Sequence, residues 1–254
     1  MSNPTGHPIH KRLESGFWAY ASQEAEDFDV MYYVKGTIFF ILFYLFIHLI
    51  VHCICVICNS VYRDRDTVKR IEYRTYVLSC LHSPIAVFLS FSAMFLVCGD
   101  NNTVWNDEKC YETPRYIHIW SLLNTCGYFI VDLFYLAVYT GDDTPLTYQT
   151  YAHHIVSIFT FYETAFFMNW MMIFGCLLLF TEVSTMFVSG RTLLFYHGMQ
   201  ESWIYNINAV LALIMFFLGR IVYQIGLTLI MGLPYYIHDV TKDKAEALNI
   251  FVLT

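Results

Sequence analysis

Long apolar stretches dominate this sequence. The first, "TIFFILFYLFIHLIVHCICVI" (Thr37–Ile57), contains no Asp, Glu, Lys or Arg. A helix needs roughly 20 apolar residues to cross a hydrocarbon core of about 30 Å, and this stretch meets that length. Five similar stretches follow. The one that begins at Tyr151 is short, and the last, which begins at Trp203, is long enough to tilt or to break near Gly219 or Gly226. The sequence predicts membrane spans at Thr37–Ile57, Thr75–Val97, Ile117–Val138, Tyr151–Phe167, Trp170–Val188 and Trp203–Leu233.

Composition agrees with a membrane protein. Of the 254 residues, 57% are hydrophobic and only 14% are charged, and the mean hydropathy is +0.48. A soluble domain needs a more polar surface than this composition supplies. The formal net charge of −7 is scattered, without the basic stripe that nucleic-acid binding requires. The predicted class is an all-α membrane protein, a polytopic bundle of about six transmembrane helices, and nucleic acid is excluded as a partner.

Polar segments frame the bundle. Residues 1–35 form a polar tail, 36–68 hold the first span and a basic loop, 69–240 hold the other spans, and 241–254 form a second tail. The opening "MSNPTGHPIHKRLESG" lacks the apolar core of a secretory signal. The acid-rich segment that follows it is equally unlike a mitochondrial presequence. We therefore expect the internal helices to direct targeting, either to an endomembrane or to the mitochondrial inner membrane.

The loop after the first span indicates the orientation. Positively charged loops stay on the cytosolic or matrix side of a membrane, so we expect this loop to face that side. The loop between the second and third spans then lies on the opposite side. There Cys98 and Cys110 flank the loop, and both a disulfide bond and chance spacing stay open. The basic cluster consists of Arg63, Arg65, Lys69, Arg70 and Arg74.

Polar residues inside the spans are the informative positions, because an unpaired polar group in hydrocarbon is costly. In the third span Asn124, Tyr128 and Asp132 recur every four residues and so share one helix face, which we expect to point inward. In the sixth span Arg220 needs a carboxylate, which Asp132 or Glu182 can supply. Two roles stay open for these groups: interhelical bonds that fix packing, and direct contact with a ligand.

Two adjacent histidines, His153 and His154, begin the fourth span. Neighbours on a helix point about 100° apart, so we expect only one of them to face a given site. Neutral imidazole can act as a general base, a metal ligand or a hydrogen-bonding group at a membrane interface. We expect His154 to bond a lipid headgroup or an interior carboxylate, and His153 to hold the helix start at the interface.

A metal site is the less favoured interpretation. His48 and His52 stand four residues apart in the first span, a spacing that suits a metal ion, and three cysteines follow them. No second set of ligands with clear spacing accompanies them. We therefore expect these histidines to serve in packing. No metal or cofactor is predicted, other than a bound phospholipid, sphingolipid or acyl chain.

Five sequence blocks, taken in order, resemble the successive blocks of the TLC domain family. They are "YRTYVLSCLHSPIAV", "GYFIVDLFY", "YAHHIVSIF", "FTEVSTMFVSGRTLLFY" and "YNINAVLALIMFFLGRIVY", within roughly Lys69 to Val240. In that family the second block contributes an Asp, the third the paired His, the fourth a Glu and an Arg, and the last an Asn and an Arg. Together with Asn124 and Tyr128, the residues implied as a cavity lining are His82, Asp132, His153, His154, Glu182, Ser184, Thr185, Arg191, Asn206 and Arg220.

The family divides by chemistry. Ceramide synthases of this fold carry a second motif, His-Asp-x-x-Asp, on which their acyl transfer depends. Here the corresponding region reads "LFTEVSTMF", with Glu182 near the place of the missing residues. The chain thus resembles the branch without synthase activity, whose members are associated with membrane lipid composition. No catalytic residue is assigned.

The resulting hypothesis is a membrane protein that holds a lipid or an acyl chain in a polar-lined interior cavity and acts in membrane lipid organisation or homeostasis. One alternative is a lipid-binding accessory subunit of a larger membrane complex, such as a respiratory assembly of the mitochondrial inner membrane. Another is an acyl-CoA-dependent lipid-modifying enzyme. The subunit hypothesis depends on the tail Met1–Asp29, which is too polar to fold alone. Its anchors on partner subunits would be Phe17, Trp18 and Tyr20.

Overall fold

The structure is a computed structural model, and it describes residues 23, 30–98, 103–104, 108–140, 145–167, 170–234, 236–238 and 240–241. Within these ranges it contains helices and no strands, which confirms the predicted all-α class. The α-helices are α3 (Val30–Cys58), α4 (Ser60–Arg63), α5 (Thr67–Phe95), α6 (Glu108–Glu112), α7 (Tyr116–Tyr135), α8 (Pro145–Phe167), α9 (Trp170–Leu178), α10 (Val183–Tyr196), α11 (Trp203–Phe216) and α12 (Gln224–Leu227). A 3-10 turn at Leu179–Glu182 joins α9 to α10. Wider, π-helical turns follow α7 at Leu136–Thr140, α11 at Phe217–Tyr223 and α12 at Thr228–Gly232.

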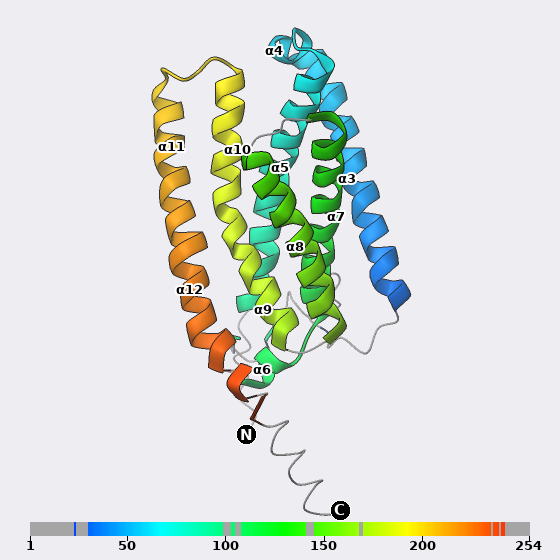
Figure 1. The fold of residues 1–254 in the computed structure, drawn as a ribbon, viewed down its shortest axis with the longest axis vertical. Helices are drawn as coiled ribbons and strands as arrows, with labels where there is room; N and C mark the ends of the chain where they lie inside the picture. Colours follow the sequence, from blue (N-terminus) through cyan, green and yellow to red (C-terminus); the bar gives the residue numbers. More distant parts are fainter. Residues whose placement is uncertain are drawn as a thin grey trace, which may run out of the picture.

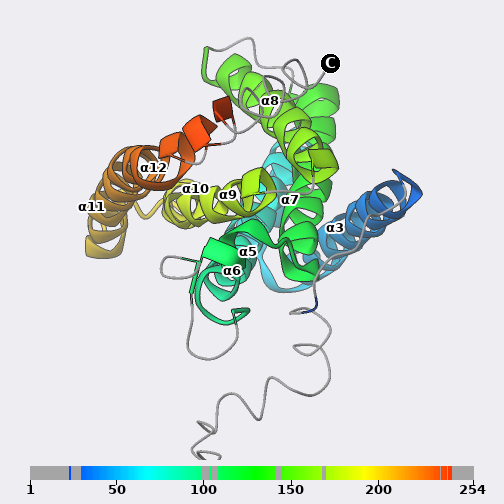
Figure 2. The ribbon, with the colours of Figure 1, turned by 90° about the horizontal axis from the view of Figure 1, so that it is seen from below.

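The helices form an up-and-down bundle (Figure 1). From the end near α6, α3 runs toward the end that carries α4, and α5 returns. α7 and α8 repeat this path, then α9 and α10 run toward the α4 end, and α11 and α12 return. Helix α7 packs against α3, α5 and α8, while α10 packs between α5 and α11. Seen along the bundle, α3 and α11 lie at opposite edges (Figure 2). We call the two ends of the bundle the α4 end and the α6 end.

Five segments in the described part of the chain are long and apolar enough to cross a membrane. Helix α8 is the exception among the predicted spans. The predicted span Tyr151–Phe167 is short and contains the polar side chains His153, His154 and Glu163, so α8 is a helix of the bundle that does not count among the apolar segments of membrane length. The five segments are Val30–Cys58, Thr67–Phe95, Tyr116–Tyr139, Trp170–Tyr196 and Trp203–His238.

The last segment departs from a regular α-helix near the glycines where a break was expected. Two π-helical stretches, Phe217–Tyr223 and Thr228–Gly232, flank α12. Such wider turns often occur at functional sites. Gly219 is buried in the first stretch, and a Cβ atom there would lie 3.3 Å from Cγ1 of Val183. The missing side chain lets this segment approach the start of α10, next to Arg220.

The basic loop at the α4 end stabilises helix ends. The Arg63 guanidinium donates to the carbonyls of Val56 and Ile57 in the last turn of α3, at 3.1 and 3.0 Å. Arg65 donates to the carbonyl of Tyr196, the last residue of α10, at 3.2 Å. These carbonyls have no partner within their helices, and cationic side chains are favourable there. The cluster therefore has a structural role as well as the charge that indicates orientation.

A buried layer of aromatic side chains crosses the middle of the bundle. It joins Tyr44 of α3, His82 of α5 and Tyr128 of α7, all at most 3% exposed. The rings of His82 and Tyr128 stack with centroids 4.0 Å apart, and Tyr44 packs edge-on against both. The Tyr44 hydroxyl lies 2.9 Å from Nδ1 of His82. We call these three residues the central layer, and it separates the two halves of the interior.

The α6 end is closed by a disulfide bond. Cys98, which follows α5, is bonded to Cys110 in α6, with Cα atoms 5.8 Å apart. Both are buried in an apolar cluster that includes Tyr111, Leu177 and Met231. The pairing that the sequence left open is therefore formed.

The proposed anchors of the amino-terminal tail lie outside the described residues. They are Phe17, Trp18 and Tyr20. Their contact with partner subunits stays a prediction.

Candidate functional site

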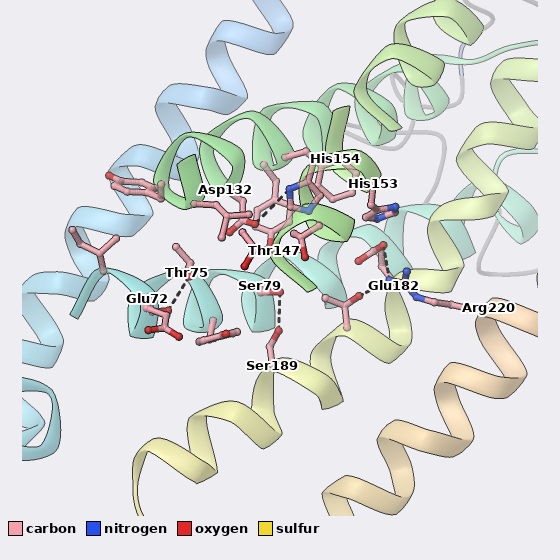
Figure 3. A pocket seen from close by; sticks show the side chains of 18 residues that line it. Glu72, Thr75, Ser79, Asp132, Thr147, His153, His154, Glu182, Ser189 and Arg220 are labelled. Atoms are coloured by element: carbon pink, nitrogen blue, oxygen red, sulfur yellow. Dashed lines mark hydrogen bonds and ion pairs between the residues drawn. The ribbon is translucent and has the colours of Figure 1, made fainter. Parts of the chain in front are cut away.

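A polar cavity of about 420 Å³ lies inside the bundle between α5, α7, α8 and α10 (Figure 3). It occupies the half nearer the α4 end, because α5 lines it with residues of its first four turns and α8 with its first half. The central layer forms its floor through Tyr128. The predicted residues that line it are Tyr128, Asp132, His153, His154, Glu182, Thr185 and Arg220.

An ion pair between Arg220 and Glu182 forms one side of the cavity. The chain tightens into a 3-10 turn at Leu179–Glu182, which leaves the Glu182 side chain only 6% exposed beside Arg220. Nη2 of Arg220 lies 3.3 Å from Oε1 of Glu182. The same guanidinium donates to the hydroxyls of Thr185 at 2.9 Å and Ser184 at 3.1 Å. Of the two carboxylates that the sequence offered to Arg220, the structure thus pairs it with Glu182.

A carboxylate and an imidazole face each other on another side of the cavity. Oδ2 of Asp132 lies 3.6 Å from Nδ1 of His154, just beyond hydrogen-bond length. The two side chains are 16% and 7% exposed. The His154 ring stacks on Phe129, one turn before Asp132 on α7, with centroids 4.5 Å apart. This stacking holds the imidazole over the carboxylate, and a small polar group entering the cavity can reach both.

Both histidines border the cavity, which corrects the expectation that only one of them would. His153 lies on the same wall as His154, with ring centroids 5.6 Å apart and with Nδ1 3.5 Å from the hydroxyl of Ser157 (Figure 3). The cavity reaches from α7 across α8 to α10, so neighbours that point about 100° apart still meet its wall. His153 is exposed, whereas His154 is 5% exposed. His154 is therefore the more enclosed of the two.

Comparison with known proteins places this bundle in a family. The family model of the TLC domain matches residues 72–253, more than half of the chain. The chain belongs to the TLC domain family. Human TLC domain-containing protein 1 is 30% identical to it over 175 residues, which cover 69% of this chain and 67% of the human protein. No solved structure matches the chain. Together with the five apolar helices, this identifies a multi-pass membrane protein.

The TLC domain match contains every residue of the cavity wall except Ile71. Five of the predicted residues lie elsewhere in the domain. The hydroxyl of Ser184 accepts a hydrogen bond from Nε of Arg220 without lining the cavity, and His82 belongs to the central layer. Asn124 lies on the far side of that layer, where its Oδ1 accepts from the Tyr44 hydroxyl at 2.8 Å.

The remaining two predicted residues lie toward the outside of the TLC domain. Arg191 is exposed, and its Nε donates to the hydroxyl of Tyr205 at 3.0 Å. Asn206 is exposed on α11. Neither lines the cavity, because both lie in the turns of α10 and α11 near the α4 end, beyond the level of Arg220.

Sequence reasoning missed several polar residues of the cavity wall. On α5 these residues recur at helical spacing, and Ser79 accepts a hydrogen bond from Ser189 of α10 at 2.9 Å. On α8 Thr147 precedes the histidines by two turns and Thr150 by one turn. The spacing of these polar residues could have revealed them, because positions three or four residues apart share one helix face. The missed polar residues are Glu72, Thr75, Ser79, Thr147, Thr150 and Ser189.

In the ranges that the structure describes, no group of three or more His, Cys, Asp or Glu side chains could hold a metal ion. The two histidines with metal-like spacing have separate partners. His48 stacks on Tyr135 with centroids 4.0 Å apart. Nδ1 of His52 lies 2.6 Å from the hydroxyl of Tyr62.

Proposed function

We propose that this TLC domain protein binds a membrane lipid in the polar cavity and acts in the organisation or homeostasis of membrane lipids. The observation that supports this is the grouping of Asp132, His153, His154, Glu182 and Arg220 around one cavity inside a membrane bundle. Polar and charged groups at this depth are costly unless they serve each other or a ligand. A volume of about 420 Å³ lies within the range of small-molecule sites.

The distribution of charge indicates which headgroups suit the cavity. Glu72 pairs with Lys69 at 2.7 Å, and Glu182 pairs with Arg220 at 3.3 Å. Among the described residues, the basic group within 4 Å of the Asp132 carboxylate is the imidazole of His154, at 3.6 Å. A headgroup that donates hydrogen bonds or carries a positive charge would give Asp132 a closer partner than this imidazole. Its acyl chains would remain among the apolar side chains of the bundle and the surrounding lipid.

Lipid retention tests this function. Purified in mild detergent, the protein is expected to carry one lipid class at near-stoichiometric level, measured by mass spectrometry of extracted lipids. Asp132→Asn removes the charge but keeps the shape of the side chain, and we expect it to lower retention roughly tenfold. Glu163→Gln is the matched control, because Glu163 is an exposed carboxylate on α8 that does not line the cavity. Equal retention by Asp132→Asn and the unmodified protein would refute the proposal.

A second candidate function is acyl transfer to or from a lipid, and the Asp132–His154 pair favours it. An imidazole oriented by a carboxylate can act as a general base. Because the His-Asp-x-x-Asp motif is missing, we expect no ceramide when the purified protein receives a sphingoid base and acyl-CoA. Turnover that His154→Ala abolishes and His238→Ala leaves intact would contradict this expectation and identify an enzyme. His238 suits the comparison because it is exposed at the end of the last segment, away from the cavity.

A further inference from the structure

A second recess lies in the other half of the interior, between α3, α5 and α7. It has a volume of about 500 Å³ and an almost wholly apolar wall. Phe39 and Ile85 at its rim are 62% and 37% exposed on the outer surface of the bundle, so the recess opens toward the surrounding lipid. We call it the aromatic groove, after its lining by Tyr32, Phe39, Phe40, Phe43 and Trp120.

The aromatic groove is distinct from the polar cavity. On α5 the cavity is lined as far as Ser79, and the groove by Ile85 and Leu89. The central layer lies between them, at the level of His82. A lipid in the cavity therefore cannot extend into the groove without breaking the contacts of this layer, so the two spaces call for separate occupants.

Asn124 supplies the amide group in the groove lining and has an unused donor, whereas the indole N–H of Trp120 already donates to the Tyr32 hydroxyl at 3.1 Å. It is 2% exposed, and its Nδ2 atom has no hydrogen-bond partner. Its Oδ1 atom accepts from the Tyr44 hydroxyl at 2.8 Å, and Tyr44 in turn meets Nδ1 of His82 at 2.9 Å. The central layer thus holds the amide oxygen. A buried donor without a partner costs about 1–3 kcal/mol, and a ligand oxygen in the groove would remove that cost.

The depth of Asn124 restricts the kind of lipid that can supply this oxygen. Asn124 stands within one helical turn of the middle of the Tyr116–Tyr139 span, a distance of about 5 Å. Ester groups of phospholipids and hydroxyls of sterols stay at the membrane interface, a half-thickness of about 15 Å from the middle. The occupant must therefore be a neutral lipid that carries an oxygen acceptor into the hydrocarbon core. The aromatic side chains that line the groove favour a ligand with a planar ring, because such a ring can stack on them.

We infer that the aromatic groove binds a neutral isoprenoid quinone. The ring lies among Phe40, Phe43 and Trp120, and one ring carbonyl accepts a hydrogen bond from Nδ2 of Asn124. The hydrocarbon tail passes the exposed side chains of Phe39 and Ile85 into the lipid. The inference is independent of the lipid proposed for the polar cavity and includes no redox step.

Photolabelling of the purified full-length protein in lipid nanodiscs tests this inference. The probe is an azido-benzoquinone with a short prenyl tail, with decylubiquinone as competitor and peptide mass spectrometry to locate the label. We expect competed labelling on the α3, α5 and α7 peptides that contain Phe39–Phe43, Ile85–Leu89 and Trp120–Asn124. Quenching of tryptophan fluorescence by decylubiquinone gives the affinity, and Trp120→Phe should remove the part of the quenching that arises in the groove.

Two variants separate a bound ring from non-specific lipid. Asn124→Leu keeps the approximate size of the side chain and should weaken binding roughly tenfold, whereas the exposed Asn206→Leu on α11 should leave it unchanged. Ile85→Trp fills the groove while keeping Asn124 and should abolish competed labelling even where Asn124→Leu does not fold. Label confined to the polar cavity, or equal labelling by a photoreactive sterol or acyl phospholipid, would overturn the inference. So would labelling of the groove only after removal of Met1–Asp29, because the tail would then be its occupant.

Discussion

Replacing Arg220 by leucine is expected to destabilise the protein by about 3–5 kcal/mol, because the change leaves the Glu182 carboxylate buried without its counter-charge. Glu182 is 6% exposed on its side chain, and Arg220 is its cationic partner at 3.3 Å. The same change also removes the donors that serve the hydroxyls of Ser184 and Thr185. The measurement is the midpoint of thermal unfolding in a fixed mild detergent.

The double variant Arg220→Leu with Glu182→Gln distinguishes a charge effect from lost packing. If the orphaned carboxylate causes most of the loss, the double variant should be more stable than Arg220→Leu alone. Arg191→Leu is the matched control, because Arg191 is an exposed arginine whose Nε donates to a tyrosine hydroxyl. An unchanged midpoint for Arg220→Leu would mean that the buried pair contributes nothing. A double variant less stable than the single variant would rule out the charge mechanism.

Gly127→Ala should be the other strongly destabilising single change, by about 1–3 kcal/mol or more, because it forces two packed helices apart. An added Cβ at Gly127 would lie 2.5 Å from Cβ of Phe40 and 3.0 Å from its carbonyl carbon, so the backbone of α3 would have to move. Helices in membranes often approach each other closely over small residues. The loss should appear as a lower midpoint of thermal unfolding.

Substitutions at two other glycines show whether the loss of stability at Gly127 comes from helix contact. At Gly36 an added Cβ would meet only the end of the Leu123 side chain, at 2.6 Å, which can rotate away. Gly226 has nothing within 4 Å of the added atom, so Gly226→Ala should leave stability unchanged or raise it. We expect the order of loss to be Gly127, then Gly36, then Gly226. A loss at Gly226 equal to that at Gly127 would show that helix contact is not the cause.

If both proposed ligands bind, they occupy opposite halves of one membrane protein. The polar cavity lies on the side of the basic loop, and the aromatic groove lies on the side of the Cys98–Cys110 bond. Tyr44 and His82 of the central layer connect the two spaces through Asn124, whose amide oxygen they hold in place. A change at Tyr44 or His82 therefore affects the groove through the amide and the cavity through the Tyr128 ring.

The sequence alone determined the fold class and the family. Apolar runs of membrane length are local properties that any tertiary arrangement must respect, so the all-α class and most of the spans followed directly. The ordered blocks from "YRTYVLSCLHSPIAV" to "YNINAVLALIMFFLGRIVY" led to the TLC domain family in the same way. The charges at Asp132, Glu182 and Arg220 were recognised as interior residues because exposing them to lipid would be too costly.

Only the tertiary structure decided which of these residues meet. Helical periodicity gives the face of each residue but not its depth relative to other helices, so it could not choose between Asp132 and Glu182 as the partner of Arg220. It grouped Asn124 with Tyr128 and Asp132, although the central layer places Asn124 in a different space. The 3-10 turn before α10 and the π-helical stretch around Arg220 arise from packing between segments distant in sequence. The pairing of Glu182 with Arg220 therefore depends on contacts that no local pattern encodes.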